Sequence, residues 1–217
     1  MQPPFYDPNR PAYLQLAGIG ATLGHELVHL FDDQNLKRRP DGQPSSAQWW
    51  TDQADRKLKK EADCFIKQYG DLLDRDSGLK VNGQLTLREN IADNSGIRTA
   101  FYAFESLEKK EKKEGRKLPK LPHLGQYTPE QTFFIAHAQV KRFVFSMNNN
   151  VFEWFCNYQI FCTRVRPETA RENVLTNPHA PARYRLNVPL SNLKQFSKAF
   201  ECKRGSKMRP ENRCRIW

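Results

Sequence analysis

Apolar residues recur at helical spacing in several stretches of the chain, and this pattern predicts a mainly α protein. The first helix is expected from about residue 13 to residue 33, where the repeating apolar positions are Leu23, Leu27, Leu30 and Phe31. Further helices are expected over residues 47–70, 86–113 and 128–146. No region is rich enough in strand patterns to predict a sheet, and the Pro- and Asn-rich residues 167–193 are expected to form loops.

Two local signals add detail to these helices. Thr86 is expected to cap the helix that follows it, with Glu89 as its capping-box partner three residues later. Gly18, Gly20 and Gly24 lie within the first helix although glycine is a poor helix former. Close packing of another backbone against this helix is one reason for such glycines.

Composition places the chain among globular proteins and limits the meaning of its charge. Its 217 residues are 38% hydrophobic and 27% charged, which suits one domain with a substantial core. The net charge is +11, yet residues 107–120 hold seven Lys/Arg against three Glu (+4), and residues 194–217 hold eight against two (+6). Neither stretch has regularly spaced aromatic residues that could stack on bases. We therefore interpret the charge as solvated surface and expect no nucleic-acid partner.

The sequence GHELVH, residues 24–29, contains the candidate chemistry. His25 and His29 lie one helical turn apart, so that both imidazoles can bind one metal ion. Glu26 projects beside them and can reach a water molecule on that ion without being a ligand. The alternative is an amphipathic helix with two unrelated histidines. A catalytic site therefore needs a third ligand elsewhere in the chain.

The sequence TLRENIAD, residues 86–93, offers that ligand. Glu89 and Asp93 share one helix face, where like charges repel unless a cation or a buried imidazole lies between them. In this interpretation Glu89 is the third ligand of one Zn²⁺, and Asp93 accepts the free N–H of a ligating histidine. Three protein ligands leave one position open for water, as a catalytic zinc site requires.

Several motifs in order, HELVH followed by FDD, VNGQLTLRENIAD, RPE and the terminal CRIW, resemble the neprilysin and endothelin-converting-enzyme family of zinc metallopeptidases. The resemblance covers nearly the whole chain. It implies a partial zincin (thermolysin-like) catalytic domain with an HExxH active-site helix. The implied zinc ligands are His25, His29 and Glu89, with Glu26 as general base and Asp93 as the partner of a ligating histidine.

The resemblance also implies a mechanism and a substrate class. His179 would stabilise the tetrahedral oxyanion, and Arg185 would bind a backbone carbonyl of a peptide substrate. The implied function is a zinc-dependent metalloendopeptidase that hydrolyses oligopeptides through a metal-activated water. The alternative is a truncated, catalytically silent remnant that binds zinc or peptide without turnover. Arg88 is a departure, because the family usually has a small residue before the ligand glutamate.

The chain resembles only the C-terminal portion of the family's enzymes, whose membrane anchor and upstream peptide-binding strand have no counterpart in it. A cell-surface (type II membrane) or secreted location is therefore implied by the resemblance alone, with any membrane contact made through the missing anchor. The resemblance pairs Cys64 with Cys214. It also places the partners of Cys162 and Cys202 in the missing N-terminal region.

Residues 140–159, VKRFVFSMNNNVFEWFCNYQ, interrupt the family spacing, since joining Gln139 directly to Ile160 restores it. The segment begins with Val and ends with Gln, whose codons can supply the GT and AG ends of an intron. We expect a translated intron here, with Cys156 outside the family's cysteine set. The alternative is a genuine apolar insertion, which exposed loops tolerate.

Overall fold

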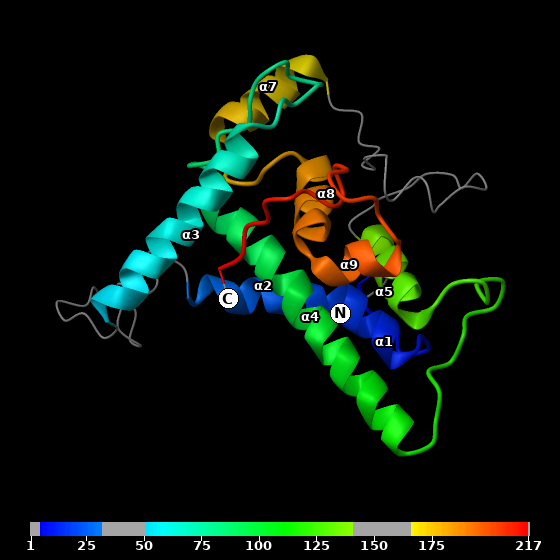
Figure 1. The fold of residues 1–217 in the computed structure, drawn as a ribbon. Coiled ribbons are helices and arrows are strands. Elements are labelled where there is room, and N and C mark those ends of the chain that lie inside the picture. Colours follow the sequence, from blue (N-terminus) through cyan, green and yellow to red (C-terminus); the bar gives the residue numbers. More distant parts are fainter. Residues whose placement is uncertain (1–4, 32–50, 141–165, 217) are drawn as a thin grey trace.

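The computed structural model describes residues 5–31, 51–140 and 166–216, and these ranges are built from helices (Figure 1). Their only β feature is an isolated antiparallel bridge between Leu73 and Lys80, which confirms the mainly α prediction. The helical elements are α1 (Ala12–Gln15), η1 (Leu16–Gly20), α2 (Ala21–His29), α3 (Asp52–Gly70), α4 (Leu87–Lys113), α5 (Pro129–Val140), α7 (Pro167–Thr176), α8 (Ala182–Asn192) and α9 (Lys194–Ala199).

Most of the predicted helices lie where the apolar pattern placed them. α1, η1 and α2 together replace the single helix expected over residues 13–33, and α4 ends at Lys113 as predicted. α3 begins after Thr51, whose hydroxyl accepts a hydrogen bond from the Ala54 N–H at 3.2 Å. The expected start of this helix at residues 47–50 and the expected extension of α5 to residue 146 lie outside the described residues.

The prediction of loops over residues 167–193 was wrong, because α7 and α8 occupy most of this range. Pro167 is at the start of α7, where a backbone N–H would have no partner within the helix, so its absence costs nothing. Pro181 precedes the first residue of α8. Pro189 lies inside α8. The prolines in this range therefore indicated the starts of helices as well as the loops between them.

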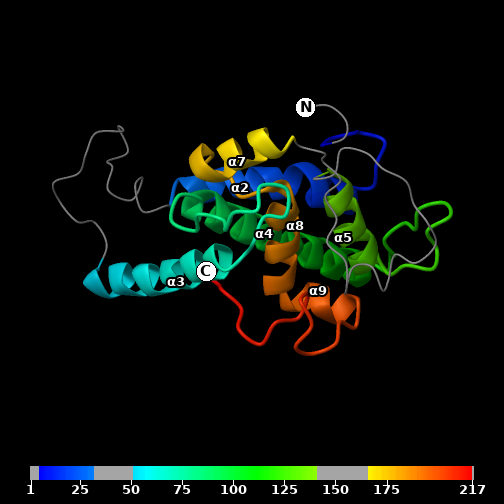
Figure 2. The same cartoon turned by 90° about the horizontal axis from the view of Figure 1, so that it is seen from above.

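The core consists of two clusters that meet along α4, the long helix through the middle of the molecule (Figures 1 and 2). The larger cluster joins α4 to α1, α5, α8 and α9 and is rich in aromatic side chains, including the stacked rings of Phe101 and Phe134, whose centroids lie 5.0 Å apart. The smaller cluster contains Phe65 and Tyr69 of α3 and Ile216, the second-last residue of the chain. Because α4 is held on both sides, it is a rigid support for any group on its remaining face.

α2 crosses α4 at a pair of glycines (Figure 1). A Cβ added to Gly24 would lie 2.9 Å from the Gly96 carbonyl oxygen. A Cβ added to Gly96 would lie 2.7 Å from the His25 nitrogen and 2.8 Å from the Ala21 carbonyl oxygen. The two backbones are therefore in direct contact, and the close packing expected for the first helix is confirmed at Gly24.

The apolar side chains that predicted the first helix lie on its solvent side. Leu23, Leu27, Leu30 and Phe31 are between 48% and 61% exposed. The face of α2 that packs on α4 is instead the one that contains Gly24 and His25, both of which are buried. None of the helices in the described ranges is both long enough and apolar enough to cross a membrane.

A disulfide joins Cys64 of α3 to Cys214 near the C-terminus, as the resemblance implied. Beside it, Asn192 accepts a hydrogen bond from the Cys214 N–H at 3.3 Å and exchanges two amide hydrogen bonds with Gln68. Cys202 is also disulfide-bonded, which contradicts the expectation that its partner lies in a missing region. The C-terminal segment is thus fixed to α3 by covalent and polar contacts.

Replacing Cys64 and Cys214 together with serine is expected to lower the free energy of unfolding by about 2–5 kcal/mol, because a long loop regains its freedom in the unfolded chain. Urea unfolding of the double variant and the parent measures the difference. Substitution is preferable to a reducing agent, which would also open the disulfide of Cys202. An unchanged unfolding midpoint would show that this disulfide contributes nothing to stability.

Candidate metal centre

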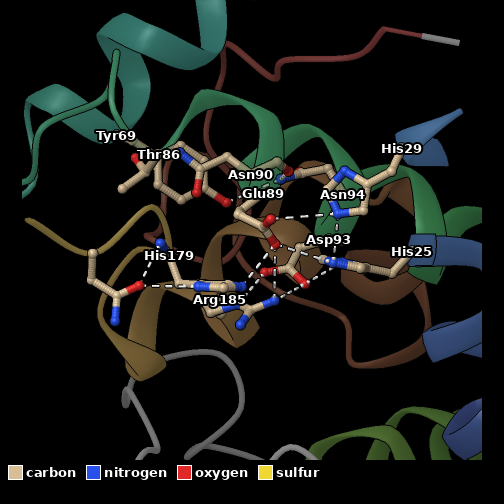
Figure 3. Close-up of polar contacts among 11 residues, drawn as sticks. His25, His29, Tyr69, Thr86, Glu89, Asn90, Asp93, Asn94, His179 and Arg185 are labelled. Atoms are coloured by element: carbon tan, nitrogen blue, oxygen red, sulfur yellow. Dashed lines mark hydrogen bonds and ion pairs between the residues drawn. The ribbon is translucent and has the colours of Figure 1, made fainter. Parts of the chain in front are cut away.

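The crossing of α2 and α4 brings together the three predicted metal ligands (Figure 3). His25 and His29 project from α2 toward Glu89, which lies in the first turn of α4. The His25 Nε2 atom lies 3.2 Å from the His29 Nε2 atom and 3.2 Å from Glu89 Oε2, and His29 Nε2 lies 3.5 Å from Glu89 Oε1. One ligand atom from each residue falls within 4.8 Å of the other two.

These separations suit a zinc ion. Metal–ligand bonds of about 2.0–2.1 Å in tetrahedral geometry place neighbouring ligand atoms about 3.3 Å apart. Glu89 Oε2 is buried and faces the Nε2 atoms of His25 and His179, at 3.2 Å and 3.0 Å. A buried carboxylate is costly unless cationic groups or a metal ion interact with it. The donor set of two imidazoles and one carboxylate fits zinc, and no other cluster of this kind occurs in the described ranges.

Asp93 orients this centre from one turn further along α4. Its Oδ1 atom lies 3.0 Å from His25 Nδ1, so the geometry assigns the Nδ1 proton to this hydrogen bond and turns Nε2 toward Glu89. Arg185 donates to both oxygens of Asp93, from Nε at 2.7 Å and from Nη2 at 3.0 Å. A bidentate guanidinium of this kind fixes the carboxylate in its plane. Asp93 therefore holds His25 and Arg185 at once.

The electrostatics of the centre favour a positive charge. Burial lowers the pKa of His25, but its contacts with Asp93 and Glu89 outweigh burial and raise the pKa to about 9. Burial raises the pKa of Glu89, but the nearby His25, His179 and His29 lower it by more. The pKa of Glu89 therefore falls below its ordinary value. Both shifts have the same origin, since two carboxylates and several cations share a poorly solvated space.

His179 lies in the loop between α7 and α8, and Arg185 lies in the first turn of α8. Both side chains point toward the centre (Figure 3). The Asn177 Oδ1 atom accepts from the His179 N–H at 2.9 Å and lies 3.0 Å from His179 Nδ1. The opposite ring nitrogen, Nε2, is 3.0 Å from Glu89 Oε2. Burial and the nearby Arg185 charge lower the pKa of His179. The sequence pattern did not point to Asn177, although Asn side chains commonly accept from the backbone N–H two residues later.

The remaining predicted residues lie at the edge of the cluster. Glu26 is exposed on α2 directly after His25, and Arg88 is half-buried next to Glu89. The predicted capping box at Thr86 is wrong, because its hydroxyl donates to the Asn82 carbonyl at 2.9 Å and accepts from Asn90 Nδ2 at 2.8 Å. Glu89 faces the two histidines instead of the helix end.

A pocket of about 390 Å³ opens beside the centre, with His179 and Arg185 in its lining. Asp74 and Asp76 border it from the turn that follows α3, and Asn173 borders it from α7. Arg183 also faces this pocket, with its Nη2 atom 3.5 Å from Asp76 Oδ2. The lining thus combines charged and polar groups with apolar ones such as Val174 and Pro181, and the pocket adjoins two residues of the candidate site.

The helical fold that contains this cluster has counterparts among known proteins, and one of them is a zinc metalloprotease. The sequence model of Peptidase family M13 matches residues 1–154 and 143–216. The chain belongs to this family.

Similar proteins include Neprilysin-1 of Caenorhabditis elegans, which is 38% identical over 217 residues that make up 100% of this chain and 26% of that protein. Endothelin-converting enzyme 1 of Homo sapiens is 36% identical over 217 residues, which make up 100% of this chain and 24% of that protein. The zinc metalloprotease Zmp1 of Mycobacterium tuberculosis, solved in complex with an inhibitor, superposes with a TM-score of 0.78 at 29% identity and covers 100% of this chain and 29% of that one. This chain thus spans about a quarter of the length of these curated relatives.

Proposed function

We propose that this chain is the C-terminal part of the catalytic domain of a zinc-dependent metalloendopeptidase, in which one zinc ion is held by His25, His29 and Glu89. The observation that supports this most directly is the convergence of three ligand atoms, one each from His25, His29 and Glu89, within 4.8 Å of one another. The orientation of His25 by Asp93 adds the outer support that metal-binding histidines require.

The mechanism assigns a task to each side chain of the site. Zinc, when bound, supplies a Lewis acid that polarises a peptide carbonyl and activates a water molecule. Glu26, exposed beside the ligands, takes a proton from the attacking water and passes it to the leaving amine. His179, held through Asn177, stabilises the oxyanion that develops. Arg185 donates to a substrate carbonyl while Nε and Nη2 stay on Asp93, because the guanidinium has further N–H groups.

Peptides are the proposed substrates, and the pocket beside His179 and Arg185 is large enough for one of their side chains. We place the protein at the cell surface or outside the cell, since the Cys64–Cys214 disulfide is typical of oxidising compartments. Residues 140–159 are proposed to be an addition to the family sequence, because joining Gln139 directly to Ile160 restores the spacing of the family motifs. Sequencing of the mature transcript across this segment tests that proposal.

Glu89→Gln is expected to weaken zinc binding at least about 100-fold, because a neutral amide replaces the only anionic ligand in the set. Competition with a chromophoric chelator measures the zinc dissociation constant of the variant and the parent. Glu105→Gln, a change of the same kind far along α4, is the matched control and should bind zinc like the parent. Equal zinc affinity in the parent and Glu89→Gln would remove Glu89 from the ligand set.

Hydrolysis of a quenched peptide, and its loss with a chelator, then separates the two functional hypotheses. Zinc-dependent cleavage supports the peptidase. Zinc binding without cleavage of any peptide tested supports the catalytically silent remnant.

A further inference from the structure

A π-helical turn directly precedes the helix that contains both histidine ligands. The helical run from Ala12 to His29 is α-helical at both ends, but η1, Leu16–Gly20, forms a π-helix between them. π-turns are rare and occur mostly as single insertions within α-helices, often at functional sites. Each extra residue in such a turn changes the direction of all following side chains by about 100°. The orientation of His25 and His29 therefore depends on this turn.

Groups from outside the helix bind the backbone of η1. The Ile19 N–H donates to the Phe5 carbonyl at 3.1 Å, although in a regular α-helix it would bond to residue 15. The Ala17 carbonyl oxygen lies 2.9 Å from His137 Nδ1. One external acceptor and one external donor thus bond to two backbone groups of η1.

His137 is placed to hold this turn and does not touch the metal centre. It belongs to α5, is only 3% exposed, and is flanked in that helix by Phe134 and Ala138 of the larger core cluster. Ala17, its partner, is fully buried in the same cluster. The contact joins residues 120 positions apart, so it ties η1 to a separate packed helix rather than to its own neighbours.

We propose that His137 is a positioning residue for the metal centre. By donating from Nδ1 to the Ala17 carbonyl, it keeps η1 in the π conformation, and η1 in turn sets the rotation of α2 that directs His25 and His29 toward Glu89. Gly24 fixes where α2 crosses α4, whereas His137 fixes how α2 is turned about its own axis. The inference rests on the proposed zinc site.

His137→Phe tests the proposal, because it keeps an aromatic ring in the core and removes the donor. We expect the zinc dissociation constant to rise roughly 10–100-fold, the usual effect of losing a group that orients metal ligands. His137→Asn, whose side-chain amide can donate from the position of Nδ1, should restore affinity to within a few-fold of the parent. The visible absorption of the cobalt-substituted protein should change with Phe and recover with Asn.

Thr132→Val is the matched control, because it removes another buried side-chain hydrogen bond of α5, from Thr132 Oγ1 to the Thr128 carbonyl, away from η1. It should lower the melting temperature without changing zinc affinity or the cobalt spectrum. His137→Met, which also lacks the donor, replaces the Phe variant if that protein does not fold. Parent-like zinc affinity and cobalt spectrum in the donor-free variant would overturn this inference alone. A parent chain that binds no zinc would overturn the metal centre and, with it, this role of His137.

Discussion

Gly96→Ala is expected to abolish zinc binding at micromolar metal and to lower the free energy of unfolding by about 1–3 kcal/mol, the usual cost of overpacking. The new methyl group would lie 2.7 Å from the His25 nitrogen and 2.8 Å from the Ala21 carbonyl oxygen. Both are backbone atoms inside a helix, so neither can move aside alone. α2 must shift away from α4, and the shift separates His25 and His29 from Glu89. Metal sites tolerate displacements of only about 0.5 Å.

Zinc affinity and urea unfolding of Gly96→Ala, measured beside the parent, give the two effects separately. Gly70→Ala is the matched control, because a Cβ at Gly70 meets no atom within 4 Å. That variant should bind zinc like the parent and be equally or slightly more stable, since alanine favours the helix. If Gly96→Ala bound zinc as tightly as Gly70→Ala, the contact between the two backbones would not be what positions the ligands.

Glu26→Gln is expected to reduce the turnover of peptide substrates by about 10²–10⁴-fold while zinc affinity stays at the parent value. Glutamine has nearly the same shape, but it cannot accept the proton of the attacking water. Glu26 is exposed and outside the ligand cluster, so its charge is not needed to hold the metal. Steady-state cleavage of a quenched peptide, with zinc content measured on the same samples, tests both halves. Cleavage at the parent rate would show that another group is the base.

Sequence spacing predicted the part of the site that lies within single helices. His25 and His29 share a face of α2, and Glu89 and Asp93 share a face of α4, because residues four positions apart in a helix always do. The charge argument at Glu89 and Asp93 also anticipated that a cation or an imidazole lies between them. The catalytic roles of these residues stay predictions until they are measured.

Contacts between distant segments could not be predicted in this way. The bidentate pair of Arg185 and Asp93 spans 92 positions, and the bond from His137 to Ala17 spans 120. Both depend on where α8 and α5 pack, which no local pattern specifies. The sequence did not predict the π-turn for a related reason, since two of its backbone groups bond to groups from other parts of the chain. Tertiary contacts here override the regular periodicity on which helix prediction relies.

The bond between Cys64 and Cys214 closes a covalent ring that contains Glu89, Asp93, His179 and Arg185 of the candidate site. The connection between α4 and α5 lies within that ring and exposes Lys117 and Lys120, which are natural points for trypsin to cut. After such a cut, Glu89 would be on one fragment and His179 on the other. The disulfide would keep the two fragments in one covalent molecule until a thiol reductant opened it. The protein could therefore lose the continuity of its chain without losing the connection between the two halves of its site.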